Sequence, residues 1–118
     1  MKEVDRQRVH DTNDEGLRQL THEHLKVFAK FTSASCPICE MLAPPFARHA
    51  DDEEFSHILF LRLNADENPV AKKIMQEKIA PFFVSYCQGR LLECDMLTTE
   101  EEVLGMLHRL REFQPMAS

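Results

Sequence analysis

The sequence lacks the features of membrane-spanning and exported proteins. No stretch approaches the roughly 20 consecutive apolar residues that a transmembrane helix needs. The first thirty residues show no signal-peptide pattern either, because charged side chains interrupt them at Lys2, Glu3, Asp5, Arg6 and Arg8. We therefore expect a cytoplasmic protein that does not bind membranes.

Internal repeats, low-complexity segments and an excess of positive charge are also absent. The chain has 118 residues and a formal net charge of -6, with 43% hydrophobic and 29% charged residues. A negatively charged chain is a poor partner for nucleic acids and anionic membranes, so neither is an expected ligand. Length and composition predict a single domain over 1–118, with 1–12 as an N-terminal extension or edge strand and 111–118 as a C-terminal tail.

Four cysteines are present, and two of them form the motif Cys36-Pro37-Ile38-Cys39. Without a secretory signal, we interpret the cysteines as thiols rather than as stabilising disulfides. A CxxC motif serves either as half of a zinc site or as a thiol redox centre. A β-prone apolar run over 27–31 ends five residues before Cys36, and helix-forming residues over 40–43 follow Cys39. This strand-to-helix setting favours a redox centre over a metal site and over two incidental cysteines.

The same setting predicts different roles for the two cysteines. Free amide groups and the positive end of the helix dipole favour a thiolate at Cys36, and the thiolate is the nucleophile of disulfide exchange. Pro37 suits the first helical position because it has no amide hydrogen to leave unpaired. Cys39 lies one turn further along the helix, where we expect it to be less exposed and to act as the resolving thiol.

The remaining patterns predict alternating helices and strands. Asn13 and Thr99 are the expected caps of the first and last helices, and Asp66 and Asn68 are expected to cap the helix that Pro69 opens. An edge strand over 8–10 is weakly indicated. The other predicted elements are a strand over 26–31, the CxxC helix over 36–50, a strand over 58–63, a helix over 69–75 and a hairpin formed by 82–86 and 91–94.

These segments resemble the thioredoxin family over roughly residues 13 to 110. The residues that carry the resemblance are the CxxC motif followed by Met41-Leu42-Ala43-Pro44, the segment Leu63-Asn64-Ala65-Asp66-Glu67-Asn68-Pro69, the run Ile79-Ala80-Pro81-Phe82-Phe83, and Gly89 in the hairpin turn. The resemblance implies an α/β protein with the thioredoxin fold, in which helices flank both faces of a central mixed β-sheet of four to five strands. It places the redox pair at an edge of that sheet.

The resemblance also implies a substrate groove beside the redox pair. It assigns Pro81 to the cis form and gives Pro81 and the Ala80 backbone the task of binding an extended substrate chain. Ser35 and Ile38 complete the expected groove, although Ser35 stands where thioredoxins usually carry a tryptophan, a residue absent from this chain. We further expect the apolar side chain of Ile79 to help anchor the segment.

Lys30 departs from the family pattern. The resemblance places a buried carboxylate at this position, beneath the redox pair, where it moves protons to and from the resolving thiol. Three alternatives follow for the lysine: it reaches the surface and has no chemical role, it remains charged and stabilises a thiolate at Cys39, or it is neutral and acts as the base. The sequence leaves all three open.

The other two cysteines lie in the predicted hairpin. Counting outward from the turn pairs Cys94 with Phe83, so Cys87 and Cys94 should not bond to each other. We expect Cys87 to be exposed at the turn and to be the better candidate for modification. No metal site and no cofactor are expected.

The function predicted from these observations is that of a thioredoxin-like protein-disulfide oxidoreductase. Its Cys36-Cys39 pair would exchange with protein or small-thiol substrates, and a thioredoxin-reductase-type enzyme or glutathione would supply electrons. An alternative is a redox-silent adaptor or chaperone that retains the scaffold, and a third interpretation is cluster binding by the CxxC cysteines at a dimer interface. We expect a monomer.

Overall fold

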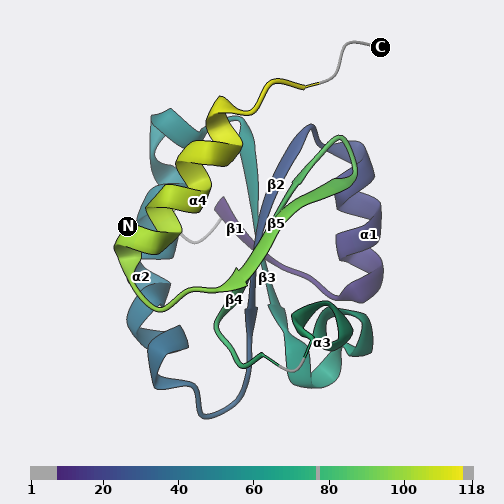
Figure 1. The fold of residues 1–118 in the computed structure, drawn as a ribbon, viewed down its shortest axis with the longest axis vertical. Helices are drawn as coiled ribbons and strands as arrows, with labels where there is room; N and C mark the ends of the chain where they lie inside the picture. Colours follow the sequence, from purple (N-terminus) through teal and green to yellow (C-terminus); the bar gives the residue numbers. More distant parts are fainter. Residues whose placement is uncertain (1–7, 77, 116–118) are drawn as a thin grey trace.

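The chain alternates strands and helices in the predicted order, as a computed structural model describing residues 8–76 and 78–115 shows (Figure 1). The strands are β1 (Val9–Asp11), β2 (Lys26–Thr32), β3 (Ile58–Asn64), β4 (Phe82–Cys87) and β5 (Arg90–Met96). The α-helices are α1 (Asp14–Glu23), α2 (Pro37–Asp51), α3 (Pro69–Met75) and α4 (Glu100–Glu112), and short 3-10 turns span Glu53–Phe55 and Ala65–Glu67.

The two expected terminal segments are partly structured. The predicted edge strand is β1, whereas positions 1–7 of the expected extension lie outside the described residues. The C-terminal tail was expected to begin at residue 111, whereas α4 continues as far as Glu112. Positions 116–118 also lie outside the described residues.

Five strands form one mixed sheet in the order β1-β3-β2-β4-β5. Strands β1, β2 and β3 are parallel, while β4 is antiparallel to β2 and β5 is antiparallel to β4. Because the three parallel strands end at the same edge of the sheet, the loop that follows β2 leaves the sheet at that edge. The fold therefore places the CxxC motif where the resemblance implied.

The helices cover both faces of the sheet, and each pair encloses its own core. Helices α2 and α4 cover one face, and α1 and α3 cover the other (Figure 1). Alternation along β2 sends Phe28 to the α2/α4 side, and Val27, Ala29 and Phe31 to the α1/α3 side. No helix within the described ranges has the length and apolar character required to cross a membrane.

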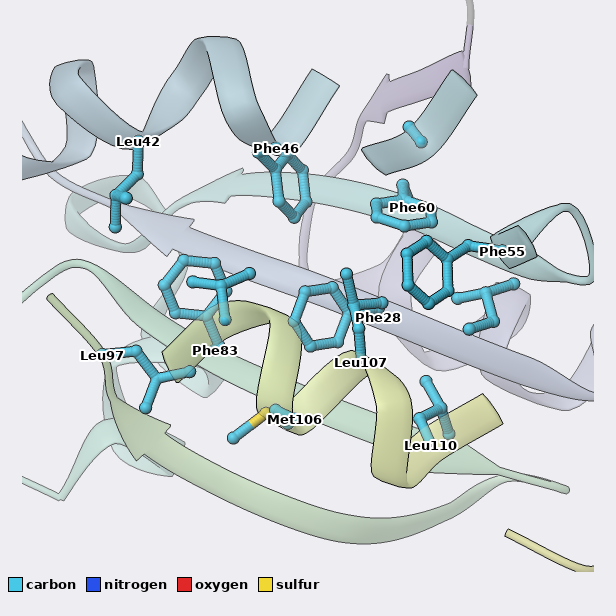
Figure 2. Packing of buried hydrophobic residues seen from close by; sticks show 13 residues of the cluster. Phe28, Leu42, Phe46, Phe55, Phe60, Phe83, Leu97, Met106, Leu107 and Leu110 are labelled. Atoms are coloured by element: carbon cyan, nitrogen blue, oxygen red, sulfur yellow. The ribbon is translucent and has the colours of Figure 1, made fainter. Parts of the chain in front are cut away.

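Aromatic rings fill the core beneath α2 and α4. The ring of Phe28 lies 5.8 Å from that of Phe60 in an edge-to-face arrangement and 5.7 Å from that of Phe83 in a stacked one. Phe46 of α2 packs on the same group, with its ring 5.3 Å from that of Phe60 (Figure 2). These contacts hold α2 against the sheet, and so fix the helix that carries the two cysteines.

Two predicted helix caps are confirmed. The Asn13 side chain accepts a hydrogen bond from the Gly16 N–H at 2.8 Å at the start of α1. The Thr99 hydroxyl accepts one from the Glu102 N–H at 3.2 Å at the start of α4. Each cap satisfies an amide that has no partner inside its helix.

The predicted side-chain cap of α3 is wrong. Asn68 occupies the capping position, but its side chain makes no cap bond there. The carboxylate of Asp14 does so instead, since its oxygens accept from the N–H groups of Val70 and Ala71 at 2.8 and 2.9 Å. The Asn68 side chain in turn accepts from the Asp14 N–H at 2.8 Å, so α1 and α3 cap each other's first turns.

Candidate active site

Cys36 lies at the junction between β2 and α2. Three residues separate the end of β2 from Cys36, which is the N-cap residue of α2. Ser35 within this loop has a φ of 57°, a left-handed conformation that turns the chain into the helix. Pro37 takes the first helical position, so the predicted transition from strand to helix is confirmed.

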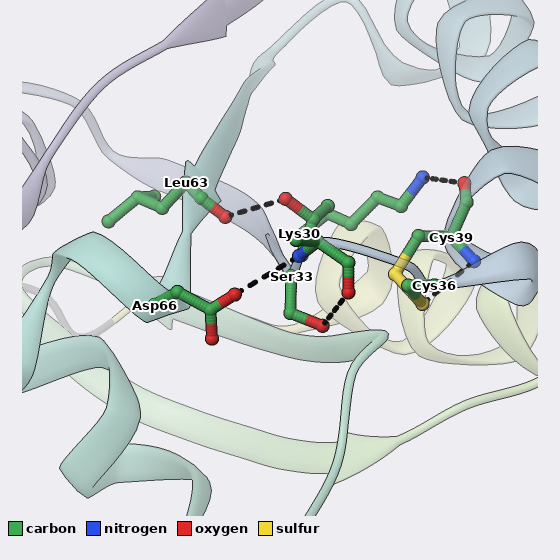
Figure 3. Close-up of a disulfide and its surroundings, with 8 residues drawn as sticks. Lys30, Ser33, Cys36, Cys39, Leu63 and Asp66 are labelled. Carbon is green, nitrogen blue, oxygen red and sulfur yellow. Dashed lines mark hydrogen bonds between the residues drawn. A yellow bond between two sulfur atoms is a disulfide. The ribbon is translucent and has the colours of Figure 1, made fainter.

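Cys36 and Cys39 form a disulfide with their Cα atoms 5.2 Å apart (Figure 3). The Cys39 backbone N–H donates to the Cys36 Sγ at 3.1 Å. This donor and the helix dipole both favour negative charge on the Cys36 sulfur when the disulfide is reduced. The exposed fractions of the two residues are similar, 8% for Cys36 and 6% for Cys39, so the amide donor distinguishes them better than burial does.

Lys30 is buried beneath this pair. Only 1% of its surface is exposed, and its Nζ donates to the Cys39 carbonyl oxygen at 2.8 Å (Figure 3). The same nitrogen lies 5.5 Å from the centre of the Phe46 ring. The alternative in which Lys30 reaches the surface is therefore wrong, because the side chain is folded under the first turns of α2.

Burial changes the acidity of Lys30. Loss of water around the ammonium group, together with the nearby Arg62 guanidinium, lowers the pKa of Lys30 from 10.5 to about 8. Arg62 is held by two hydrogen bonds to the Asp11 carboxylate, at 2.7 and 3.0 Å, and so stays charged. Within the described part of the chain Lys30 makes no ion pair, so the charged and the neutral form are both accessible near neutral pH.

The four expected groove residues differ in exposure. The Ala80–Pro81 peptide bond is cis, with Pro81 buried and Ala80 half-buried. Ile38 is half-buried against the α2/α4 core, and Ser35 is exposed. Ile79 does not anchor its segment as expected, because 69% of its surface is exposed. Its side chain is available for contact with another molecule.

Asp66 has a role that the sequence analysis missed. Its Oδ2 accepts a hydrogen bond from the Ala34 N–H at 3.1 Å and so ties the loop before Cys36 to the end of β3 (Figure 3). Asp66 follows a parallel strand at the edge where the CxxC loop also leaves the sheet. This position after a parallel strand could have indicated the contact with the CxxC loop. From the sequence we instead interpret Asp66 as a helix cap, because it lies close to the start of α3.

The two remaining cysteines do not join the site. Cys94 pairs with Val84 rather than with Phe83, because an irregularity in the β4–β5 ladder shifts the register by one residue. Cys87 is buried and Cys94 is exposed, so the expectation of an exposed Cys87 is wrong. Both are free thiols. Within residues 8–76 and 78–115, no three His, Cys, Asp or Glu side chains are placed to hold a metal ion.

Comparison with known proteins identifies the family. The thioredoxin family profile matches residues 8–105 of this chain. Thioredoxin H5 of Arabidopsis thaliana is 25% identical over 90 residues, a stretch that covers 76% of this chain and 75% of that protein. The profile match spans the CxxC motif together with β2 and α2, between which the motif lies.

Solved structures agree at the level of the fold. The short form of thioredoxin f from spinach chloroplast gives a TM-score of 0.80 at 17% identity, covering 89% of this chain and 95% of that one. A chain from the crystal structure of ferredoxin:thioredoxin reductase with thioredoxin f2 gives a TM-score of 0.74 at 16% identity, and the match covers 89% of this chain and 96% of that one. Since the family profile spans most of its length, this chain belongs to the thioredoxin family.

Proposed function

We propose that this protein is a thiol–disulfide oxidoreductase whose Cys36-Cys39 pair exchanges with disulfides of protein substrates. The observation that carries the proposal is the disulfide at the first turn of α2, with the Cys39 amide directed at the Cys36 sulfur. An amide donor at a helix N-terminus stabilises the thiolate, and the thiolate is the form that attacks disulfides.

The exchange takes two steps in the reducing direction. The Cys36 thiolate attacks one sulfur of a substrate disulfide, which forms a mixed disulfide and releases the other substrate sulfur as a thiolate. Cys39 then loses its proton and attacks the Cys36 Sγ, which releases the second substrate sulfur and closes the Cys36–Cys39 disulfide. Two electrons pass to the substrate, and an external thiol donor must return them.

Lys30 takes part in this cycle through its charge. With a pKa of about 8, about nine-tenths of its amine is protonated at pH 7. The ammonium form stabilises a thiolate at the pair, whereas the neutral minority can accept the proton that Cys39 loses. Its hydrogen bond to the Cys39 carbonyl supports both roles because it keeps Nζ beside the resolving cysteine.

The substrate groove and the partners are part of the same proposal. We assign Ala80 and Pro81 to binding of an extended substrate chain, with Ser35 and Ile38 on the side of the motif. A thioredoxin-reductase-type enzyme or glutathione is the proposed electron donor, and the reductase complex of thioredoxin f2 supports the first. We place the protein in the cytoplasm as a monomer.

A trapping experiment tests the function. The reduced Cys39→Ser variant, incubated with a protein that has an accessible disulfide, should accumulate a mixed disulfide that a reducing agent releases. Cys36→Ser should form none, and Cys94→Ser is the matched control, because it removes an exposed thiol away from the motif and should turn over like the wild type.

The same experiment distinguishes the adaptor alternative. An adaptor would bind its partner without forming the mixed disulfide, and the wild type would leave the substrate disulfide oxidised. Mixed disulfides formed equally by the Cys36→Ser and Cys39→Ser variants would remove the attacking role from Cys36.

A further inference from the structure

A cavity of about 320 Å³ lies next to the proposed substrate groove. Ala80 forms part of its wall, so the cavity adjoins the backbone that we assign to substrate binding. Its polar lining residues are Ser33 from the loop after β2, Asp66 from the 3-10 turn after β3, Lys72 of α3, and Lys78 from the segment before Ala80. A substrate chain on Ala80 could therefore place a neighbouring side chain in the cavity.

Exposed lysine side chains gather near this cavity although the chain as a whole carries a charge of -6. Of the lysines that the structure describes, Lys26 and Lys30 are buried. The exposed ones are all on α3 or just after it: Lys72, Lys73 and Lys78. Two of these three line the cavity.

Two carboxylates lie near these lysines, but they do not pair directly with all of them. Asp66 lines the cavity with its anionic carboxylate, one oxygen of which accepts the Ala34 N–H, but it forms no ion pair with Lys72 or Lys78. Lys78 pairs with Asp95 at 3.0 Å, but both side chains are about half exposed, and such surface pairs are weak and exchangeable. Lys72 forms no ion pair within 8–76 and 78–115. A ligand carboxylate in the cavity would thus meet one unpaired ammonium group, that of Lys72, and a second that it can share with Asp95, with the Asp66 carboxylate as the one anionic group in the lining.

The remaining lining residues are apolar. Met75 and Ala65 are buried at the cavity, and Ile79 adds an exposed aliphatic side chain. A glutamate or aspartate side chain combines an aliphatic stem with a carboxylate and so matches both parts of the lining.

We propose that this cavity binds an acidic side chain close to the reactive disulfide of a protein substrate. The inference rests on the proposed thiol–disulfide exchange and names a substrate class for it. An acidic residue near the target disulfide would raise the local concentration of the substrate and orient its chain along Ala80. It would thereby increase the rate of attack by Cys36.

Two disulfide-containing peptides that differ by one glutamate or glutamine beside the disulfide test the proposal. We expect the reduced wild-type protein to reduce the glutamate peptide about 1.4- to fivefold faster, the range for an ion pair at a partly exposed site. The doubly substituted variant Lys72→Gln/Lys78→Gln should reduce both peptides at the rate at which the wild type reduces the glutamine peptide. Lys73→Gln is the matched control, since it removes an exposed lysine of the same helix that does not line the cavity, and it should keep the preference.

The possible outcomes distinguish a failure of the acidic subsite from a failure of the proposed thiol–disulfide exchange. Reduction of both peptides at equal rates by the wild type would overturn the acidic subsite and leave the exchange chemistry intact. The acidic subsite would also be overturned if Lys73→Gln lost the preference for the glutamate peptide to the same extent as the double variant. General charge attraction would then explain that preference. Failure to reduce either peptide would contradict the proposed function itself.

Discussion

Replacing Lys30 with methionine should stabilise the oxidised protein at neutral pH. The native ammonium group is buried without an ion pair among the described residues, and its pKa falls from 10.5 to about 8 through loss of water and the Arg62 charge. A shift of this size corresponds to about 3 kcal/mol of destabilisation when the amine is charged in both folded and unfolded states. Methionine has a similar length and carries no charge, so the substitution removes this cost.

The substitution also removes a favourable hydrogen bond. The hydrogen bond from Lys30 Nζ to the Cys39 carbonyl contributes about 1 kcal/mol, a typical net value for a hydrogen bond in a protein. The expected net gain for Lys30→Met is therefore about 2 kcal/mol at pH 7. A gain of this size is a substantial fraction of the total stability of a small domain.

The pH dependence of the gain identifies its cause. The unfolded chain holds the Lys30 proton up to about pH 10.5, whereas the folded chain releases it near pH 8. The wild type therefore becomes more stable as the pH rises from 8 to 10.5, and the advantage of the variant shrinks over that window. The pKa of Tyr86 is also raised, but this affects the wild type and Lys30→Met equally, so it cancels in the difference between their free energies of unfolding.

Urea denaturation of the two oxidised proteins at pH 7 and pH 10 measures the effect. We expect Lys30→Met to be the more stable protein at pH 7 and to lose that advantage at pH 10. A difference between the proteins that stays constant over this range would refute the reasoning, because Lys30 would then not titrate between the two pH values.

Three further predictions concern the cysteines and the charge beneath them. In the reduced protein at pH 7, an alkylating reagent should modify Cys36 faster than Cys39, as peptide mass analysis would show; the reverse order would exchange the two roles. In the oxidised protein, Cys94 should react before Cys87, because Cys87 is buried in the native fold, and equal rates would contradict that burial. Lys30→Asp should lower the reduction potential of the pair, measured against glutathione, because a carboxylate disfavours the thiolates of the reduced form; an unchanged potential would show that Lys30 does not act through its charge.

The sequence predicted those features that local patterns determine. The transition from β2 to α2 followed from an apolar run, a CxxC motif and a proline suited to the first helical position. The caps at Asn13 and Thr99 followed because a capping side chain acts within three residues of its own position. For the same reason, the order of elements could be derived without knowledge of the tertiary contacts.

Features that depend on distant residues could not be derived in this way. Asp14 caps a helix that begins 55 positions later in the chain, so no local pattern reveals the contact. The register that places Cys94 opposite Val84 depends on a one-residue irregularity in the β4–β5 ladder, which counting from the turn does not detect. A sequence cannot tell whether the long side chain of Lys30 reaches solvent or turns beneath α2, since both are compatible with a strand position.

A redox titration of the Cys36-Cys39 pair tests the central claim most directly. The protein is equilibrated with mixtures of reduced and oxidised glutathione, quenched, and scored for the disulfide in the wild type and in the Cys94→Ser control. We expect one two-electron transition, unchanged in the control, at a potential above the value of about -270 mV known for thioredoxin, because Pro37 follows the attacking cysteine and Lys30 favours thiolates. A pair that fails to interconvert under any glutathione ratio would contradict the assignment of a redox-active disulfide, and a potential at or below that of thioredoxin would contradict the role given to Lys30.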